Sequence, residues 1–157
     1  MEIQVLDDSP FSEYRQGRFK NLTMRNSEED YIKYRFERAW QTFGDAKALA
    51  NLGSWNSSMN RLYYACFYAV LALFIKNKIS SHTHSGAKTQ LSLHFVRSGR
   101  LDKEFAMLYG DLFDLRQKGD YGDFFDFEEK HIITLIPKVE EFLLKIEILT
   151  KEESISN

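Results

Sequence analysis

The chain contains few cysteines, which could cross-link it, and few prolines, which interrupt helices and strands. Its 157 residues include one cysteine, Cys66, and two prolines. A single cysteine excludes a disulfide framework within the chain, and a lone thiol on an apolar helix face is usually a small core residue. A chain of this length buries a core without disulfides or a metal. We therefore expect a buried Cys66 and a cytoplasmic protein.

Neither sign of charge dominates the sequence. The net charge is -2, which argues against a protein that holds nucleic acid by bulk positive charge. The total hides a split, because residues 76–103 have a net charge of +5 and residues 104–157 a net charge of -7. Two solvated faces explain the split; the alternative is a local site for an anionic ligand near the loop after the central helix.

Targeting segments are also missing. The first ten residues contain acidic side chains where a secretion signal has a basic flank and an apolar run. The longest stretch with almost no charge is broken by Arg61, which leaves 14 residues from Leu62 to Ile75. A helix needs about 20 consecutive apolar residues to span a bilayer. We predict no secretion signal and no membrane association.

The stretch from Ser54 to Lys78 has the strongest helical pattern. Its apolar side chains recur every three or four residues and form one face of a helix. Arg61 is the only charged residue between Ser54 and Ile75, which is typical of a helix surrounded by others. We predict that this is the central helix. Its apolar face consists of Trp55, Met59, Leu62, Cys66, Val70 and Leu73, widened by Tyr63, Phe67 and Phe74.

The preceding segment predicts a second helix, antiparallel to the central one. Ser27 stands before three acidic residues, a hydroxyl cap followed by charges that suit the positive end of a helix dipole. Apolar residues at helical spacing continue to Asn51, and Gly53 supplies a stop. The predicted helix covers residues 28–51, and the short connection makes the two helices neighbours.

Three further helices follow the central one. Pro137 lies inside the last, and an internal proline costs about 3 kcal/mol, so we expect a kink or a break about one turn before it. No strand pattern competes, so the fold class is all-α, an up-and-down bundle of four to five helices. In order, we expect a polar loop over 79–87, a short helix over 88–98 stopped by Gly99, a helix over 101–121 with Phe105, Leu108, Leu112 and Leu115 inward, and a last helix capped by Asp126 with Ile132, Leu135, Val139, Phe142, Ile146 and Leu149 inward.

The domain organisation is an N-terminal arm or tail over residues 1–26, a helical bundle over 27–151 and a C-terminal tail over 152–157. Cations alternate with aromatic residues in the arm, which fits either nucleic-acid binding, with cations on phosphates and rings on bases, or a plain packing arm. These arm residues are the cations Arg15, Arg18, Lys20 and Arg25 and the aromatic residues Tyr14, just before Arg15, and Phe19, between Arg18 and Lys20.

Two stretches resemble a known family. NRLYYACFYAVLALFI (60–75) resembles the central helix of HEPN domains, the higher eukaryote and prokaryote nucleotide-binding domains. HTHSG (82–86) and FDLRQKGDYGDFFDFEE (113–129) resemble the loop and the arginine-bearing helix of one bacterial and archaeal branch. The resemblance covers residues 28–149. It implies a bundle, commonly a homodimer, in a superfamily whose active members cut RNA without a metal or other cofactor.

The resemblance also implies where catalytic residues would lie. In active members an arginine holds the phosphate, and a histidine four to six residues further on acts as acid or base. Arg116 matches the arginine, but Tyr121 and Asp123 occupy the region of the histidine. A tyrosine of pKa near 10 is a poor general base at neutral pH, and an aspartate a poor acid. The catalytic candidates are therefore Arg116 with Tyr121, or with His84 reaching the site through space; the alternative for His84 is that it and Ser85 cap the next helix.

The ligand-binding candidates leave two interpretations open. Arg116 and Asp120 are four residues apart, which fits a phosphate clamp or a helix-end ion pair. We expect Arg116 at the surface, because it lies off the apolar face of its helix. Arg61 lies on a face of small side chains that fits a second subunit or the solvent edge. The full candidate set is Arg116, Asp120, Arg61, Tyr64 and Tyr68.

No metal site is expected. His82 and His84 are two residues apart, but no further histidine or carboxylate cluster stands at ligand spacing.

Two functions follow from the resemblance. The first is a non-catalytic module that binds RNA or a nucleotide as part of a toxin–antitoxin or defence system, with a nucleotidyltransferase and a second copy of the chain as partners. The second is a metal-independent ribonuclease that uses Arg116 with Tyr121 or His84.

Overall fold

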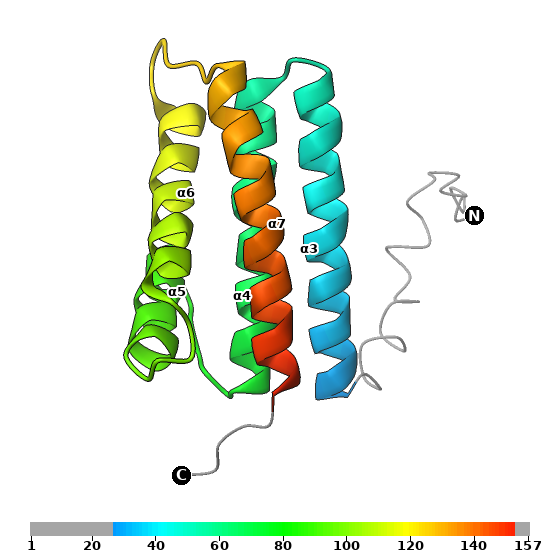
Figure 1. Ribbon diagram of the computed structural model, residues 1–157, viewed down its shortest axis with the longest axis vertical. Helices are drawn as coiled ribbons and strands as arrows, with labels where there is room; N and C mark the ends of the chain where they lie inside the picture. The colour runs from blue at the N-terminus through cyan, green and yellow to red at the C-terminus, as the bar shows by residue number, and fades with distance from the viewer. Residues whose placement is uncertain (1–26, 153–157) are drawn as a thin grey trace, which may run out of the picture.

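The computed structural model describes residues 27–152. This part of the chain is an all-α bundle without strands, as predicted. Figure 1 shows the long helices standing side by side, with α4 behind α7 and the short α5 beside α6. The N-terminal arm, with its proposed nucleic-acid contacts, lies outside the described residues. The elements, numbered as in Figure 1, are α3 (Glu28–Asn51), α4 (Trp55–Lys76), α5 (His84–Leu91), the π-helical turn η1 (Ser92–Val96), α6 (Lys103–Tyr121) and α7 (Glu129–Lys151).

Local signals at both ends of α3 explain its bounds, which are those predicted. Asp30 N donates to Ser27 Oγ at 3.3 Å, and Ser27 N donates to Asp30 Oδ2 at 3.1 Å, a reciprocal capping box. At the other end Gly53 adopts a φ of 73°. Ser54 N then donates to the Leu49 carbonyl at 2.9 Å, the pattern of a glycine-terminated helix.

The helix α4 is the centre of the bundle, as predicted. It contacts α3, α5, α6 and α7, and Leu62 and Cys66 on its apolar face are fully buried. Burial raises the pKa of the Cys66 thiol far above its usual range, so the thiol is a core group and not a thiolate. Ser58 Oγ donates to the Ala46 carbonyl at 2.7 Å and fixes the register of α3 against α4.

The helix α4 is longer than the uncharged run of 14 residues from which we predicted that it cannot span a membrane. The helix Trp55–Lys76 has 22 residues and a mean hydropathy of 1.3 in its best window, long and apolar enough to cross a membrane by length and composition alone. However, 61% of that window is buried inside the bundle, and the core helix of a soluble protein passes the same test.

The loop after α4 is shorter than predicted. The helix α5 begins at His84 and not at Lys88, because Thr83 Oγ1 accepts a hydrogen bond from Gly86 N at 2.9 Å and caps the helix. The expected capping role of His84 and Ser85 therefore belongs to Thr83. The helix widens into a π-helical turn at η1, and the chain leaves it through Gly99 at a φ of 75°, the predicted stop.

The start of α7 differs from the prediction, and the helix continues through Pro137. Asp126 does not cap it, because its carboxylate accepts from Asn56 Nδ2 at 3.1 Å, and Glu128 takes the cap position. The helix also does not break at Pro137. Both Pro137 and Ile133, whose carbonyl loses its helical partner, are exposed, so water can satisfy that carbonyl. A kink at Pro137 stays a prediction.

Candidate functional site

Side chains from three helices meet around one buried tyrosine. Tyr63 of α4 is fully buried, and its ring centroid lies 5.2–6.0 Å from those of the surrounding aromatic rings. We call the group the Tyr63 cluster; it comprises Tyr63, Tyr64 and Phe67 of α4, His84 of α5, and Phe113 and Arg116 of α6.

Arg116 is buried, contrary to the prediction that it lies at the surface. Only 7% of the residue is exposed. Its guanidinium carbon lies 4.7 Å from the Tyr63 ring centroid and 5.6 Å from that of Tyr64, a cation–π arrangement. One nitrogen lies 3.6 Å from Asp120 Oδ2. The buried Nε has no hydrogen-bond partner among residues 27–152, so this buried cation is incompletely paired.

The burial of Arg116 follows from the rotation of α6. Tyr109, Leu112 and Arg116 face inward at helical spacing, and all three are buried. Of the four residues predicted to face inward, only Leu112 is fully buried. The other three, Phe105, Leu108 and Leu115, are partly buried against the core. The apolar stem of an arginine packs on aromatic rings as a hydrophobic side chain does, which a pattern of apolar letters does not register.

A polar chain links α4 to α6 beside Arg116. Asn60 Nδ2 donates to both carboxylate oxygens of Asp120, at 3.3 and 3.0 Å. Asn60 Oδ1 accepts from Arg61 Nε at 3.0 Å and from Arg61 Nη2 at 2.6 Å. Asn60 was not among the predicted site residues, although its position next to Arg61, the only arginine of α4, was an available signal.

Both arginines approach the same ring. The guanidinium carbon of Arg61 lies 5.1 Å from the Tyr64 ring centroid, and that of Arg116 lies 5.6 Å from it. Asp120 is the carboxylate that this chain of contacts reaches. Two cations and one carboxylate leave one positive charge, which suits an anionic ligand.

His84 joins the site through Tyr63. Its Nδ1 lies 2.7 Å from the Tyr63 hydroxyl, and its ring centroid lies 4.4 Å from that of Phe67. Burial first, and then the charge of Arg116, lower the pKa of His84 below its usual 6.5, so the imidazole is neutral at pH 7. Burial raises the pKa of Tyr63 to about 12, so the phenol keeps its proton. Either group can donate in this bond, and the tautomer of His84 decides which.

The remaining candidates lie at the edges of this site. Tyr68 packs against Tyr64 with ring centroids 6.1 Å apart. The guanidinium carbon of Arg38 in α3 lies 5.9 Å from the Tyr68 ring centroid. Tyr121, at the end of α6, is 77% exposed. No ring, ionic or hydrogen-bond contact joins it to Arg116 or His84 in the described part of the chain. Of the two predicted partners of Arg116, His84 therefore lies in the same cluster, and Tyr121 does not.

The loop after α6 presents an exposed aromatic residue that the sequence did not predict. Phe124 is fully exposed at a φ of 57°, an uncommon conformation for a bulky residue. Asn56 holds the loop, donating to the Phe125 carbonyl at 3.2 Å and accepting from Phe127 N at 2.8 Å. A side chain at Gly122 would clash with the backbone carbonyl of Lys118, so this turn requires glycine.

Metal-binding groups do not mark this site. Residues 27–152 contain no cluster of three or more histidine, cysteine, aspartate or glutamate side chains arranged to hold a metal ion.

The fold defines a helical-bundle protein in which a buried arginine of α6, Arg116, packs on aromatic rings of α4. The family model of the HEPN domain matches residues 32–149, about three quarters of the chain. The chain belongs to the HEPN family, which confirms the resemblance.

Three relatives show how far the similarity extends. A UPF0332 protein of Thermotoga maritima is 38% identical over 127 residues, which cover 81% of this chain and 96% of the relative. A Methanocaldococcus jannaschii protein named "Putative toxin" is 26% identical over 128 residues, 82% of this chain and 86% of the relative. A UPF0332 protein of Gloeobacter violaceus is 36% identical over 86 residues, 55% of this chain and 68% of the relative.

Proposed function

We propose that this HEPN protein is a component of a toxin–antitoxin or defence system and binds RNA or a nucleotide through a phosphate at the Arg61–Arg116 side of the Tyr63 cluster, without cutting it. The observation that supports this best is the incompletely paired guanidinium of Arg116, held beside Arg61 on the Tyr64 ring. The toxin part of this proposal rests on the name of the Methanocaldococcus jannaschii relative, "Putative toxin".

A bound phosphate supplies hydrogen-bond acceptors for the incompletely paired guanidinium of Arg116. Each phosphate oxygen accepts hydrogen bonds, and a guanidinium presents planar donors that pair with two oxygens at once. Arg61 is half-buried and the Asp120 side chain is 27% exposed, so a ligand can approach from solvent. Asp120 can stay bound to Asn60 when a phosphate replaces it at Arg116, since its contact with Arg116 is the longer one.

The second candidate is a metal-independent ribonuclease that uses Arg116 with His84. The observation that favours it is that both residues contact Tyr63. A neutral imidazole can remove a proton from a ribose hydroxyl if its second nitrogen has a free lone pair. That requires His84 Nδ1–H to donate to Tyr63, leaving Nε2 unprotonated. Tyr121 is the weaker partner because its exposed ring makes no contact with this site among the described residues.

The tautomer of His84 separates the two candidates. We expect Tyr63 to donate to Nδ1, which places the proton on Nε2 and leaves no base. Nitrogen chemical shifts of the imidazole, measured by NMR at pH 7, report which nitrogen is protonated. An unprotonated Nε2, together with cleavage of RNA in the presence of a chelator, would contradict the non-catalytic proposal and support the ribonuclease.

Binding is tested with a labelled single-stranded RNA by fluorescence anisotropy. Arg61→Gln is expected to weaken binding ten- to a hundredfold, because a charge-assisted contact contributes about 1.5 to 3 kcal/mol. Arg97→Gln is the matched control, since Arg97 is an exposed cation away from the site. Equal losses in both variants would show that only overall charge matters and would reject the site.

The partners belong to the same proposal. We expect a cytoplasmic homodimer, as is common in the family, and a nucleotidyltransferase encoded by a neighbouring gene. Light scattering at micromolar concentration tests the first partner, and co-expression with the neighbouring gene product followed by co-purification tests the second. A monomer throughout this range would reject the homodimer.

A further inference from the structure

A second polar hollow lies at the other end of α4. Asn77 follows Tyr63 by 14 residues, about 21 Å along the helix axis, so the hollow is separate from the Tyr63 cluster. Its volume of about 630 Å³ is typical of small-molecule sites. Its wall contains cations, amides and hydroxyls but no acidic side chain. The lining residues are Asn77, Lys78, Ile79, Ser80, Gln90, His94, Phe95, Ser98 and Arg100.

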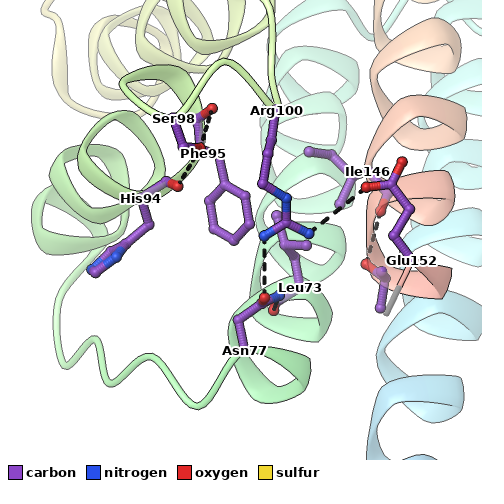
Figure 2. Close-up of polar contacts among 9 residues, drawn as sticks. Leu73, Asn77, His94, Phe95, Ser98, Arg100, Ile146 and Glu152 are labelled. Atoms are coloured by element: carbon purple, nitrogen blue, oxygen red, sulfur yellow. Dashed lines mark hydrogen bonds and ion pairs between the residues drawn. The ribbon is translucent and has the colours of Figure 1, made fainter. Parts of the chain in front are cut away.

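Arg100 lines the hollow and keeps N–H donors available for hydrogen bonds to a ligand. Its side chain is 19% exposed, and its guanidinium carbon lies 5.1 Å from the Phe95 ring centroid. Figure 2 shows it reaching Asn77 on one side and Glu152 on the other. These contacts are long, 3.4 Å to Asn77 Oδ1 and 3.8 Å to Glu152 Oε2. A guanidinium has five N–H donors, so most of them stay available to a ligand.

Lys78 also lines the hollow, at a position where glycine is usual. It ends α4 at a φ of 54°, with Ile79 N donating to the Phe74 carbonyl at 2.9 Å. A lysine in this left-handed conformation is strained where a glycine is not. Its ammonium pairs with Glu28 Oε2 at 2.8 Å, but both side chains are largely exposed, and such pairs contribute little.

Side chains at the hollow donate hydrogen bonds to three backbone carbonyls near the helix ends. Asn77 Nδ2 donates to the Leu73 carbonyl at 2.8 Å at the negative end of α4. Ser98 Oγ donates to the carbonyls of His94 at 2.9 Å and Phe95 at 3.2 Å, beside the π-helical turn. π-helical turns are rare in proteins overall, but where they occur they are often found at functional sites. These three carbonyl oxygens are therefore already hydrogen-bonded within the protein.

We propose that this hollow binds the phosphate of a small phosphate monoester through the lining cations Arg100 and Lys78, with His94 and Gln90 as further polar contacts. Two cations that line one hollow suit a dianion, and the oxygens of a tetrahedral phosphate can accept hydrogen bonds from several donors at once. His94 Nε2 lies 2.8 Å from Gln90 Oε1, so the amide nitrogen of Gln90 is free to donate.

Binding is tested by NMR on the ¹⁵N-labelled full chain. Inorganic phosphate, glycerol 3-phosphate and AMP are titrated separately, with sodium chloride at equal ionic strength as the reference. We expect saturable shifts in the amides of residues 77–80 and 90–100, and the ester with the lower Kd identifies the class of ligand. Shifts confined to the Tyr63 cluster, or unsaturated shifts at exposed cations everywhere, would overturn the proposal.

Three substitutions make the test specific. Arg100→Gln is expected to weaken binding of the best probe at least tenfold. Lys78→Gly should also weaken it severalfold while the melting temperature is unchanged or higher, because glycine relieves the backbone strain. Arg97→Gln removes a neighbouring exposed cation that does not line the hollow and should change the Kd less than twofold.

Substitution of a carboxylate beside the hollow should have the opposite effect on affinity. Glu152→Gln removes the anion that competes for Arg100 and should tighten binding severalfold. If Arg100→Gln fails to fold, Lys78→Gly and Glu152→Gln still decide the question. Unchanged affinity in Lys78→Gly, or a loss in Arg97→Gln equal to that in Arg100→Gln, would overturn the site.

Discussion

Replacing Arg116 by methionine separates its contribution to folding from its contribution to binding. Methionine keeps the length and the apolar stem but removes the charge. The lost terms are a desolvated cation–π contact with Tyr63, about 1 to 2 kcal/mol, and a partly exposed ion pair with Asp120, about 0.2 to 1 kcal/mol. The gained term is relief of a buried guanidinium whose Nε has no partner among the described residues, about 1 to 3 kcal/mol.

These terms nearly cancel. Asp120 is not orphaned by the substitution, because Asn60 still donates to both of its oxygens. We expect the free energy of unfolding to change by less than about 1 kcal/mol, which for a chain of this size shifts the melting temperature by less than about 4 °C. Affinity for single-stranded RNA should fall ten- to a hundredfold.

The measurements are thermal melting and fluorescence anisotropy on the same preparations. Arg97→Met is the matched control and should change neither quantity, because Arg97 is exposed. Arg116→Lys keeps the charge but loses the planar fork, so it should bind RNA between the wild type and Arg116→Met. A drop in melting temperature above 10 °C with unchanged RNA affinity would show that Arg116 is a structural residue and refute the reasoning.

The other predictions concern stability and pH. Leu62→Ala should reduce the free energy of unfolding by about 2 to 5 kcal/mol, because Leu62 is fully buried, and an unchanged melt would contradict this packing. Pro137→Ala should raise the melting temperature by restoring a helical hydrogen bond at an exposed position, and a lower value would refute this. The pKa of His84 is lowered in the fold, so the unfolded chain binds more protons as the pH falls below about 6.5. Stability should therefore decline from that pH downward, and the decline should weaken in His84→Gln; a decline of equal size in both would exclude His84 as its source. Arg116→Met should raise the pKa of His84 by removing a nearby positive charge, which NMR titration measures, and an unchanged pKa would contradict that electrostatic contact.

The sequence predicted α3 and α4 well because the signals that define them are local. Ser27 and Asp30 cap each other within one turn, and Gly53 ends the helix with bonds to the residues just before it. The failure at Asp126 has the opposite cause. Asn56, 70 residues away in the chain, binds that carboxylate and moves the start of α7 to Glu128. Contacts of that separation are invisible to a local pattern.

Only part of the candidate site could be predicted from the sequence, which named several of its residues but not the central Tyr63 or Asn60. Arg116, Arg61, Tyr64 and Asp120 were proposed from family resemblance and spacing, and the structure links them through contacts. Their arrangement could not be predicted, because it depends on the rotation of α6, which buries Arg116 on the Tyr63 ring. Asn60 was missed for the same reason, since its role is set by a partner on another helix.

The register bond between Ser58 and the Ala46 carbonyl has a consequence for how the chain folds. These residues are 12 apart, in two helices joined by a short link, and α3 with α4 form the most extensive helix pair of the described chain. Closing so short a loop costs little entropy, so we expect this hairpin to be structured in the folding transition state. Ser58→Ala should then slow refolding more than it speeds unfolding, whereas Leu143→Ala in α7 should mainly speed unfolding. Stopped-flow kinetics giving the reverse partition would show that the chain folds from its C-terminal half.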